Sequence, residues 1–134
     1  MKIRKVKKED IKQCVKLSKI PEFEIGNMYP DKDSLIEMMK HKLFLVAEEN
    51  KRIVGFIAGY RHSKKDVYID LLTVSKKGKG IGKKLLEELK KLMKKQKIKL
   101  FWLIAPEFNK KTLNFYRKNK LKQGKSYKVF YNKI

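Results

Sequence analysis

The sequence predicts a mixed α/β (α+β) fold in which a sheet of about six to seven strands is flanked by about four helices. Three observations support this prediction. Several short segments have the apolar runs of strands, other segments have apolar residues at helical spacing, and no repeat or Pro/Gly-rich hinge interrupts the 134 residues. A chain of this length suits one core, so we expect a single domain over residues 1–134.

The first third of the chain predicts one strand and two helices. An edge strand is expected over Met1–Val6 and a helix over Glu9–Ile20, whose buried face would hold Ile11, Cys14, Val15 and Ser18. The polar segment Ile20–Asp33 is interpreted as a loop. Ser-x-x-Glu at the start of Ser34–His41 has the spacing of a capping box, which predicts a short helix there.

Three strands separated by polar turns follow and predict an antiparallel meander: Leu43–Glu48, Ile53–Tyr60 and Val67–Val74. The next helix extends to about Gln96, because one face carries Leu85, Leu86, Leu89, Leu92 and Met93. A buried strand over Ile98–Ala105, with Trp102 in the core, would complete a right-handed βαβ unit. The predicted order ends with one helix and two strands: Lys110–Lys118, Leu121–Gln123 and Ser126–Asn132.

The formal net charge of +22 comes from 36 Lys and Arg residues against 14 Asp and Glu residues. Such a charge favours weak, salt-sensitive binding to nucleic acids, and a nucleic-acid- or ribosome-associated protein is one interpretation. Only four of the basic residues are arginines, the residue type preferred for bidentate base contacts. A solvated lysine-rich surface is therefore the competing interpretation.

Cysteine usage and hydropathy predict a cytoplasmic protein. Cys14 is the only cysteine, so the chain can form no internal disulfide, and its place on an apolar helix face predicts a core residue. The first ten residues contain no apolar signal-peptide segment, and no apolar run is long enough to span a membrane. His41 and His62 stand alone near turns, so we expect no metal site.

The segment Ser75–Leu89, SKKGKGIGKKLLEEL, places three glycines directly before the long amphipathic helix. It does not match a Walker A loop, because Lys77 stands where the first glycine is needed and Lys84 where Ser or Thr is needed. It does not match the dinucleotide fingerprint either, because Lys83 replaces the third glycine. Unpaired N–H groups at a helix start bind phosphate readily, so the segment predicts a phosphate site of another kind.

Two motifs resemble the GCN5-related N-acetyltransferase (GNAT) family. Residues 77–82, KGKGIG, are similar to its pyrophosphate loop [Q/R]-x-x-G-x-[G/A], with Lys77 in place of Gln or Arg. The block from Asn109 to Leu121 is similar to the family's N-x-x-A-x-x-x-Y-x-x-x-G-F pattern, in which Asn109 and Tyr116 match. The preceding strand, Tyr68–Val74, resembles the family's fourth strand. The resemblance covers nearly the whole chain and implies the acyl-CoA N-acyltransferase fold.

The resemblance implies acetyl-CoA (coenzyme A) as cosubstrate. The pyrophosphate would be held by the loop and helix start, formed by Lys77, Gly78, Lys79, Gly80, Ile81, Gly82 and Lys83. The pantetheine arm would pair with the end of the strand, formed by Leu72, Thr73 and Val74. Asn109 would help to fix the same arm, and Tyr116 would lie beside it.

The implied reaction is direct attack of an amine on the thioester in a ternary complex. A lysine-type amine, with an ordinary pKa of about 10.4, arrives protonated, so a base must take its proton. Asp70, the acidic residue inside the strand, is the candidate base and would act through water. The N–H of Val74 would stabilise the developing oxyanion, and Tyr116 matches the family's general acid.

The acidic residues of the loop predict a cationic acceptor. Residues 20–33 contain Lys32 as their single basic residue against four acidic ones: Glu22, Glu24, Asp31 and Asp33. The resemblance places this loop beside the acceptor, and a local acidic patch would attract a cation to a basic protein. We therefore expect Glu22 and Glu24 to bind a protein N-terminus, a lysine side chain or a polyamine. Helix capping by Asp31 or Asp33 is the structural alternative.

The leading hypothesis is thus an acetyl-CoA-dependent N-acetyltransferase that acts as a monomer or a homodimer without a membrane partner. A non-catalytic regulator that binds acyl-CoA on the same fold is the third interpretation, beside the nucleic-acid-binding one.

Overall fold

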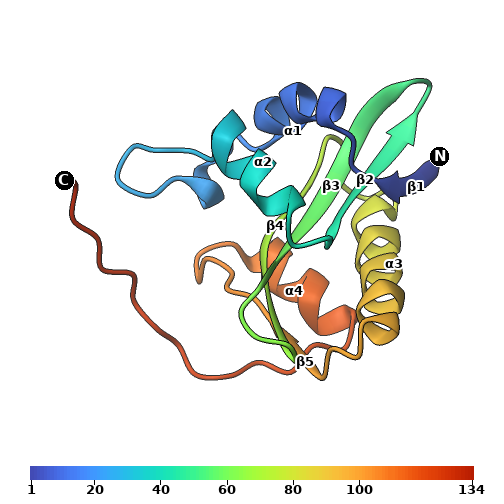
Figure 1. Cartoon of the computed structure of the whole chain (residues 1–134). Coiled ribbons are helices and arrows are strands. Elements are labelled where there is room, and N and C mark those ends of the chain that lie inside the picture. The colour runs from blue at the N-terminus through green and yellow to red at the C-terminus, as the bar shows by residue number, and fades with distance from the viewer.

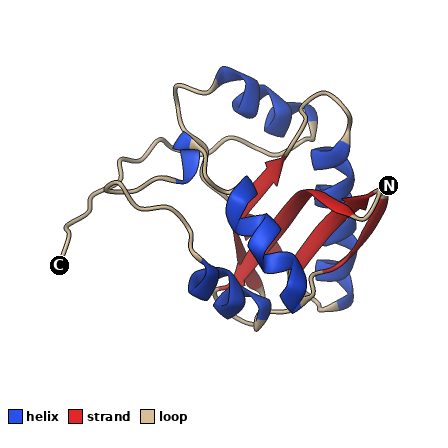
Figure 2. Cartoon of the chain, turned by 90° about the horizontal axis from the view of Figure 1, so that it is seen from above, coloured by secondary structure: helices blue, strands red, loops and turns tan.

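The computed structural model describes all 134 residues and places one sheet between helices (Figures 1 and 2). Four α-helices and two short 3-10 helices accompany five strands. Along the chain these elements are β1 Lys2–Lys5, η1 Lys8–Asp10, α1 Ile11–Leu17, η2 Pro21–Phe23, α2 Lys32–Met39, β2 Phe44–Glu49, β3 Arg52–Arg61, β4 Asp66–Val74, α3 Ile81–Lys95, β5 Leu100–Trp102 and α4 Lys110–Lys118.

The strands lie in the order in which they occur in the sequence, β1-β2-β3-β4-β5. The first four are antiparallel neighbours, and β5 runs parallel to β4 after the α3 crossover. The mixed sheet, the meander and the βαβ unit are therefore confirmed. The expected number of strands was too high, because the sheet has five rather than six or seven.

The two strands expected at the C-terminus, Leu121–Gln123 and Ser126–Asn132, are not formed. The segment leaves the end of α4 and runs outside the sheet (Figure 1), and every side chain after Leu121 is exposed. Alternating Tyr and Val residues favour a strand only where a neighbouring strand pairs with them. Here the Tyr131 ring instead lies against Gly26, in the loop that precedes α2.

Strand β5 is shorter and less buried than expected. It covers Leu100–Trp102 rather than Ile98–Ala105, and 43% of Trp102 is exposed, so Trp102 is not a core residue. Helical residues cover only one face of this strand. Phe101 and Leu103 pack toward that face, whereas alternation along the strand turns Leu100, Trp102 and Ile104 to the uncovered side.

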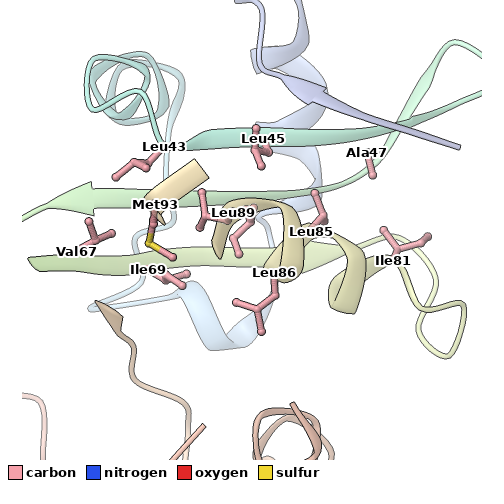
Figure 3. Packing of buried hydrophobic residues seen from close by; sticks show 11 residues of the cluster. Leu43, Leu45, Ala47, Val67, Ile69, Ile81, Leu85, Leu86, Leu89 and Met93 are labelled. Carbon is pink, nitrogen blue, oxygen red and sulfur yellow. The ribbon is translucent and has the colours of Figure 1, made fainter. Parts of the chain in front are cut away.

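The core lies on both faces of the sheet. On one face α3 presents its predicted apolar stripe to β2, β3 and β4 (Figure 3), with contributions from Leu45, Ile57, Val67, Ile69, Leu85, Leu86, Leu89 and Met93. On the other face α1 and α2 cover the sheet through Ile11, Cys14, Leu35, Met38, Val46 and Phe56. Cys14 is fully buried, as predicted. No helix combines the length and the apolar character that a membrane crossing would need.

Helix α2 begins one turn earlier than the predicted capping box at Ser34. Asp31 is the N-cap and its Oδ1 accepts the Ser34 N–H at 2.9 Å, while Ser34 Oγ accepts the Asp31 N–H at 3.0 Å. The earlier start makes Leu35 part of the first turns, where it is fully buried beside Met38. A carboxylate caps as well as a hydroxyl does, so the burial of Leu35 favours the longer helix.

Candidate active site

One edge of β4 is paired along only a third of its length. Strand β3 pairs with β4 from end to end, whereas β5 pairs only with Asp66–Tyr68. Beyond Tyr68 the second edge of β4 has no neighbouring strand. The resemblance described above implies that the cofactor arm binds this free part of the strand, at Leu72, Thr73 and Val74.

The free edge offers backbone groups rather than side chains. Thr73 is buried with its hydroxyl directed to the Leu17 carbonyl of α1, and the side chains of Leu72 and Val74 pack on the α3 face. The Ser75 N–H bonds the Val54 carbonyl of β3 at 2.8 Å. Since successive N–H groups alternate between the edges of a strand, the Val74 N–H points toward the free edge.

Asp70 is the residue that the pairing of β3 and β4 leaves out. Ala58 pairs with Leu71 and Gly59 with Ile69, so a β-bulge falls at Asp70. The side chain is open to solvent on one side, while burial by the atoms around it raises the pKa of its carboxyl above the ordinary 3.8. No hydrogen bond contributes to that shift. The bulge therefore presents a carboxylate without a protein partner beside the free edge.

The loop between β4 and α3 has the geometry of an anion site. Gly78 and Gly80 have φ angles of +80° and +74°, which favour glycine, and no atom lies within 4 Å of a Cβ built at either position. Helix α3 has no side-chain cap, and its first backbone bond runs from the Lys84 N–H to the Gly80 carbonyl at 3.1 Å. The N–H groups of Ile81, Gly82 and Lys83 are therefore left without a protein acceptor.

The other predicted loop residues divide into cations and packing residues. Lys77, Lys79 and Lys83 are exposed around the helix start, where their charge adds to the partial charge of the free N–H groups. Ile81 is buried in the α3 core. Gly82 serves packing, because a Cβ there would come within 3.2 Å of the Phe115 ring of α4. These residues fit a pyrophosphate group, with Gly82 holding α4 against α3.

Asn109 is the N-cap of α4, and its side chain is bonded to the protein at both ends. Its Oδ1 accepts the Thr112 N–H at 3.1 Å, and its Nδ2 donates to Glu22 Oε1 at 2.5 Å. The sequence assigned Asn109 to the cofactor and Glu22 to the acceptor. The structure brings the two together, so that they link α4 to the loop before α2.

The remaining acidic residues of that loop also have local roles. Glu24 accepts the Asn27 N–H at 3.0 Å, and Asp31 caps α2. Asp33 lies in the first turn of α2, where a negative charge favours the helix dipole. Helix capping, which was the alternative to acceptor binding for Asp31, is thus confirmed.

An aromatic cluster adjoins Asp70. Burial, followed by the neighbouring Tyr68, raises the pKa of Tyr116 to about 12. Burial and the nearby Asp70 raise the pKa of Tyr68 to about 12. The Tyr68 ring lies 4.4 Å from that of Trp102, centroid to centroid. Tyr116 was predicted in this site, but Tyr68 and Trp102 were missed. Their pairing depends on a parallel register across a helix, which no local pattern reveals.

A parallel strand pair that opens beside an uncapped, glycine-rich helix start defines an α/β protein built to hold a phosphate-bearing cofactor at the ends of its strands. Residues 10–120 match the acetyltransferase (GNAT) family. The chain belongs to this family, and it is an acetyl-CoA-dependent N-acetyltransferase. The sequence matches none of the curated proteins with which it was compared.

Solved structures with the same fold include PaiA N-acetyltransferase from Thermoplasma acidophilum in complex with coenzyme A, which is 25% identical over 88% of this chain and 87% of that one, with a TM-score of 0.73. The aminoglycoside acetyltransferase meta-AAC0020 from an uncultured soil metagenomic sample, in complex with sisomicin, is 25% identical over 99% and 95%, with a TM-score of 0.74. Ard1 from Thermoplasma volcanium is 22% identical over 89% and 80%, with a TM-score of 0.77.

Proposed function

We propose that this enzyme acetylates a primary amine of a cationic acceptor, which is a protein N-terminus, a lysine side chain or a polyamine, by direct attack in a ternary complex. One observation carries the proposal. The free edge of β4 holds an unpartnered carboxylate, Asp70, and leads directly into a helix start whose first three N–H groups have no protein acceptor. A base and an anion site therefore lie along a single strand.

Two parts of the chain would hold acetyl-CoA. The N–H groups of Ile81, Gly82 and Lys83 would bind the pyrophosphate, with Lys77 and Lys79 adding attraction through their charge. The free backbone edge at Leu72–Val74 would pair with the amide groups of the pantetheine arm. This pairing would run the arm along the free edge from the helix start toward Asp70, where a backbone N–H of that edge would stabilise the charge that develops on the carbonyl oxygen. The Val74 N–H is too near the helix start for this role, because Val74 lies four residues, about 13 Å along the strand, from Asp70.

The acceptor nitrogen attacks the thioester carbon, and the carbon–sulfur bond breaks. Asp70 receives the proton of the amine through a water molecule, as an ionised carboxylate without a competing partner can. Tyr116 stays protonated at neutral pH because its pKa is raised to about 12. Its hydroxyl would donate a proton to the departing sulfur and regain one from the nitrogen of the tetrahedral intermediate. Of the two protons that the ammonium loses, one thus leaves through Asp70 and the other ends on coenzyme A. The products are the acetylated amine and free coenzyme A.

A cationic acceptor is supported by charge placed around the site. Glu22 accepts one hydrogen bond from Asn109 and Glu24 one from the Asn27 N–H, and no cation of the protein pairs with either carboxylate. The neighbouring structures include an aminoglycoside acetyltransferase in complex with sisomicin, a finding that is consistent with an amine acceptor.

The test measures thiol release from acetyl-CoA against a panel of polyamines, lysine derivatives and peptides with free N-termini. Thermal shifts with coenzyme A form the binding control. We expect a melting-temperature rise with coenzyme A and turnover with at least one amine. A rise without turnover on any amine would favour the non-catalytic regulator, and the absence of both would contradict the proposed site.

A further inference from the structure

The Tyr68–Trp102 pair closes one end of the gap between β4 and β5. These residues are the last registered pair of the parallel ladder, and beyond them the two strands part. Their rings lie 4.4 Å apart, 43% of Trp102 is exposed, and Tyr68 adjoins both Asp70 and Tyr116. A large exposed aromatic surface therefore forms the floor of the site proposed for acetyl transfer.

The indole edge of this floor is already bonded within the protein. Trp102 Nε1 donates to Asp66 Oδ1 at 3.1 Å, and the other oxygen of Asp66 lies 3.2 Å from His62 Nδ1. These contacts fix the orientation of the indole. With 43% of Trp102 exposed, the indole keeps surface for a ligand. An aromatic face attracts cations and covers methylene groups without forming hydrogen bonds.

Two carboxylates flank the aromatic pair on the same strand. Asp66 and Tyr68 alternate along β4 with Val67 and Ile69, which enter the α3 core, so the first two turn their side chains to the other side of the sheet. Asp70 follows at the bulge and lies near Tyr68. In a chain that carries +22 overall, this strip is a local site of negative charge. An ammonium group on the ring faces would lie near Asp70, the carboxylate that has no partner in the protein, whereas Asp66 already contacts Trp102 and His62.

We infer that Tyr68 and Trp102 bind the acceptor and select an unbranched alkylammonium, the chemistry shared by a lysine side chain and a polyamine, over a protein N-terminus. A methylene chain that ends in an ammonium group matches aromatic rings beside the unpartnered carboxylate of Asp70. An N-terminal amine is followed directly by a peptide group, to which the ring faces offer no hydrogen-bonding partner. This inference rests on the proposed function and narrows its acceptor class.

Trp102 is the only tryptophan in the chain, so its fluorescence reports on this floor alone. Titration of the coenzyme A complex with spermidine, with Nα-acetyl-lysine amide and with trialanine should change Trp102 emission for the first two ligands only. A response to spermidine alone identifies a polyamine acceptor, and a stronger response to the lysine derivative identifies a protein side chain. Either response supports the aromatic floor.

Kinetics of variants provide the second arm. Trp102→Leu should raise KM for the alkylammonium acceptor by about 2-fold to 30-fold, with the affinity for acetyl-CoA unchanged. Trp102→Phe should restore most of the loss because it keeps an aromatic face. Leu100→Ala is the matched control: Leu100 is exposed on the same face of β5, at the end of the ladder away from the gap, and its removal should leave both constants unchanged.

The inference is overturned if trialanine alone perturbs Trp102, or if Trp102→Leu leaves the acceptor KM unchanged in a folded protein. In both cases thiol release from acetyl-CoA would continue and the proposed function would stand. If spermidine changes the emission but no amine is acetylated, the proposed function fails and the aromatic cation site is retained.

Discussion

Helices α2 and α3 begin in opposite ways. Asp31 caps α2, and its carboxylate accepts the Ser34 N–H at 2.9 Å. Gly80 begins α3 without a side chain, in a left-handed conformation, and leaves three N–H groups free. A helix start whose N–H groups bond its own capping residue has few free donors for a ligand, whereas an uncapped start has several.

The same distinction separates the acidic residues. Glu22, Glu24 and Asp31 all accept hydrogen bonds from the protein, and these bonds hold the loop before α2 in place. Asp70, raised out of register by the bulge, has none. We propose that the groups without a protein partner mark the reactive side of the molecule, and each prediction below tests that proposal.

The largest effect is expected at Asp70. Asp70→Asn should lower kcat by about 100-fold, because the amine loses the group that takes its proton. Since the pKa of the wild-type carboxyl is raised above 3.8, activity should fall as the pH decreases through that raised value, and the variant should lose this dependence. Steady-state kinetics from about pH 4.5 to 9 measure both effects.

Stability supplies the control for Asp70→Asn. A carboxyl whose pKa is raised on folding is disfavoured in its ionised form, so removal of the charge should not lower the melting temperature at neutral pH. Wild-type kcat in this variant would show that solvent, and not Asp70, removes the proton.

The second largest effect is expected from Gly80→Asp, which makes the start of α3 resemble that of α2. Aspartate tolerates the left-handed conformation better than most residues, and no atom obstructs its Cβ. Its negative charge would repel the pyrophosphate and compete for the free N–H groups. We expect the Kd for coenzyme A to rise about 30-fold, as measured by calorimetry.

Gly80→Asn is the matched control for charge, because it has the same shape without the carboxylate. The fold-increase in Kd for coenzyme A should be less than a third of the increase that Gly80→Asp causes. Equal losses in the two variants would mean that backbone strain, and not occupation of the anion site, is responsible.

A smaller effect is expected at Glu22, where the roles of charge and of bonding can be separated. Glu22→Gln keeps an oxygen that can accept from Asn109 but removes the charge, whereas Glu22→Ala removes both. If the charge attracts the acceptor, both variants should raise the acceptor KM by about threefold, with acetyl-CoA affinity unchanged in Glu22→Gln. A normal KM in Glu22→Gln with a raised one in Glu22→Ala would assign Glu22 to the link with α4 alone.

The sequence was most informative where a pattern is local. The apolar stripe of α3 and the glycines before it predicted both the helix and its free N–H groups. The prediction of two C-terminal strands was wrong, because a strand needs a neighbouring strand to pair with, and an alternating sequence pattern does not show whether one is present. The start of α2 was misplaced because Asp31 and Ser34 each begin a capping pattern, and only the burial of Leu35 decides between them.

The parts of the site that were missed depend on contacts between distant residues. The bulge at Asp70 arises from pairing with β3. The Tyr68–Trp102 contact arises from the register of two parallel strands joined by 25 residues of loop and helix, residues 75–99. The bond between Glu22 and Asn109 spans 87 positions. The two members of each pair lie too far apart in the sequence for a local pattern to reveal their contact.

The smallest functional effect is expected at the capped helix. Asp31→Ala should lower the melting temperature by a few degrees, because the Ser34 N–H loses its acceptor, while the Kd for coenzyme A stays unchanged. Hydrogen bonds from Ser34 lower the pKa of Asp31 in the folded protein, so its stabilising contribution is present above the unfolded pKa and is lost as the pH falls below about 3.8. The difference in melting temperature between wild type and variant should therefore shrink in acid. If Asp31→Ala instead weakened coenzyme A binding, the two helix starts would be coupled. The contrast between the capped start of α2 and the uncapped, ligand-binding start of α3 would then no longer hold.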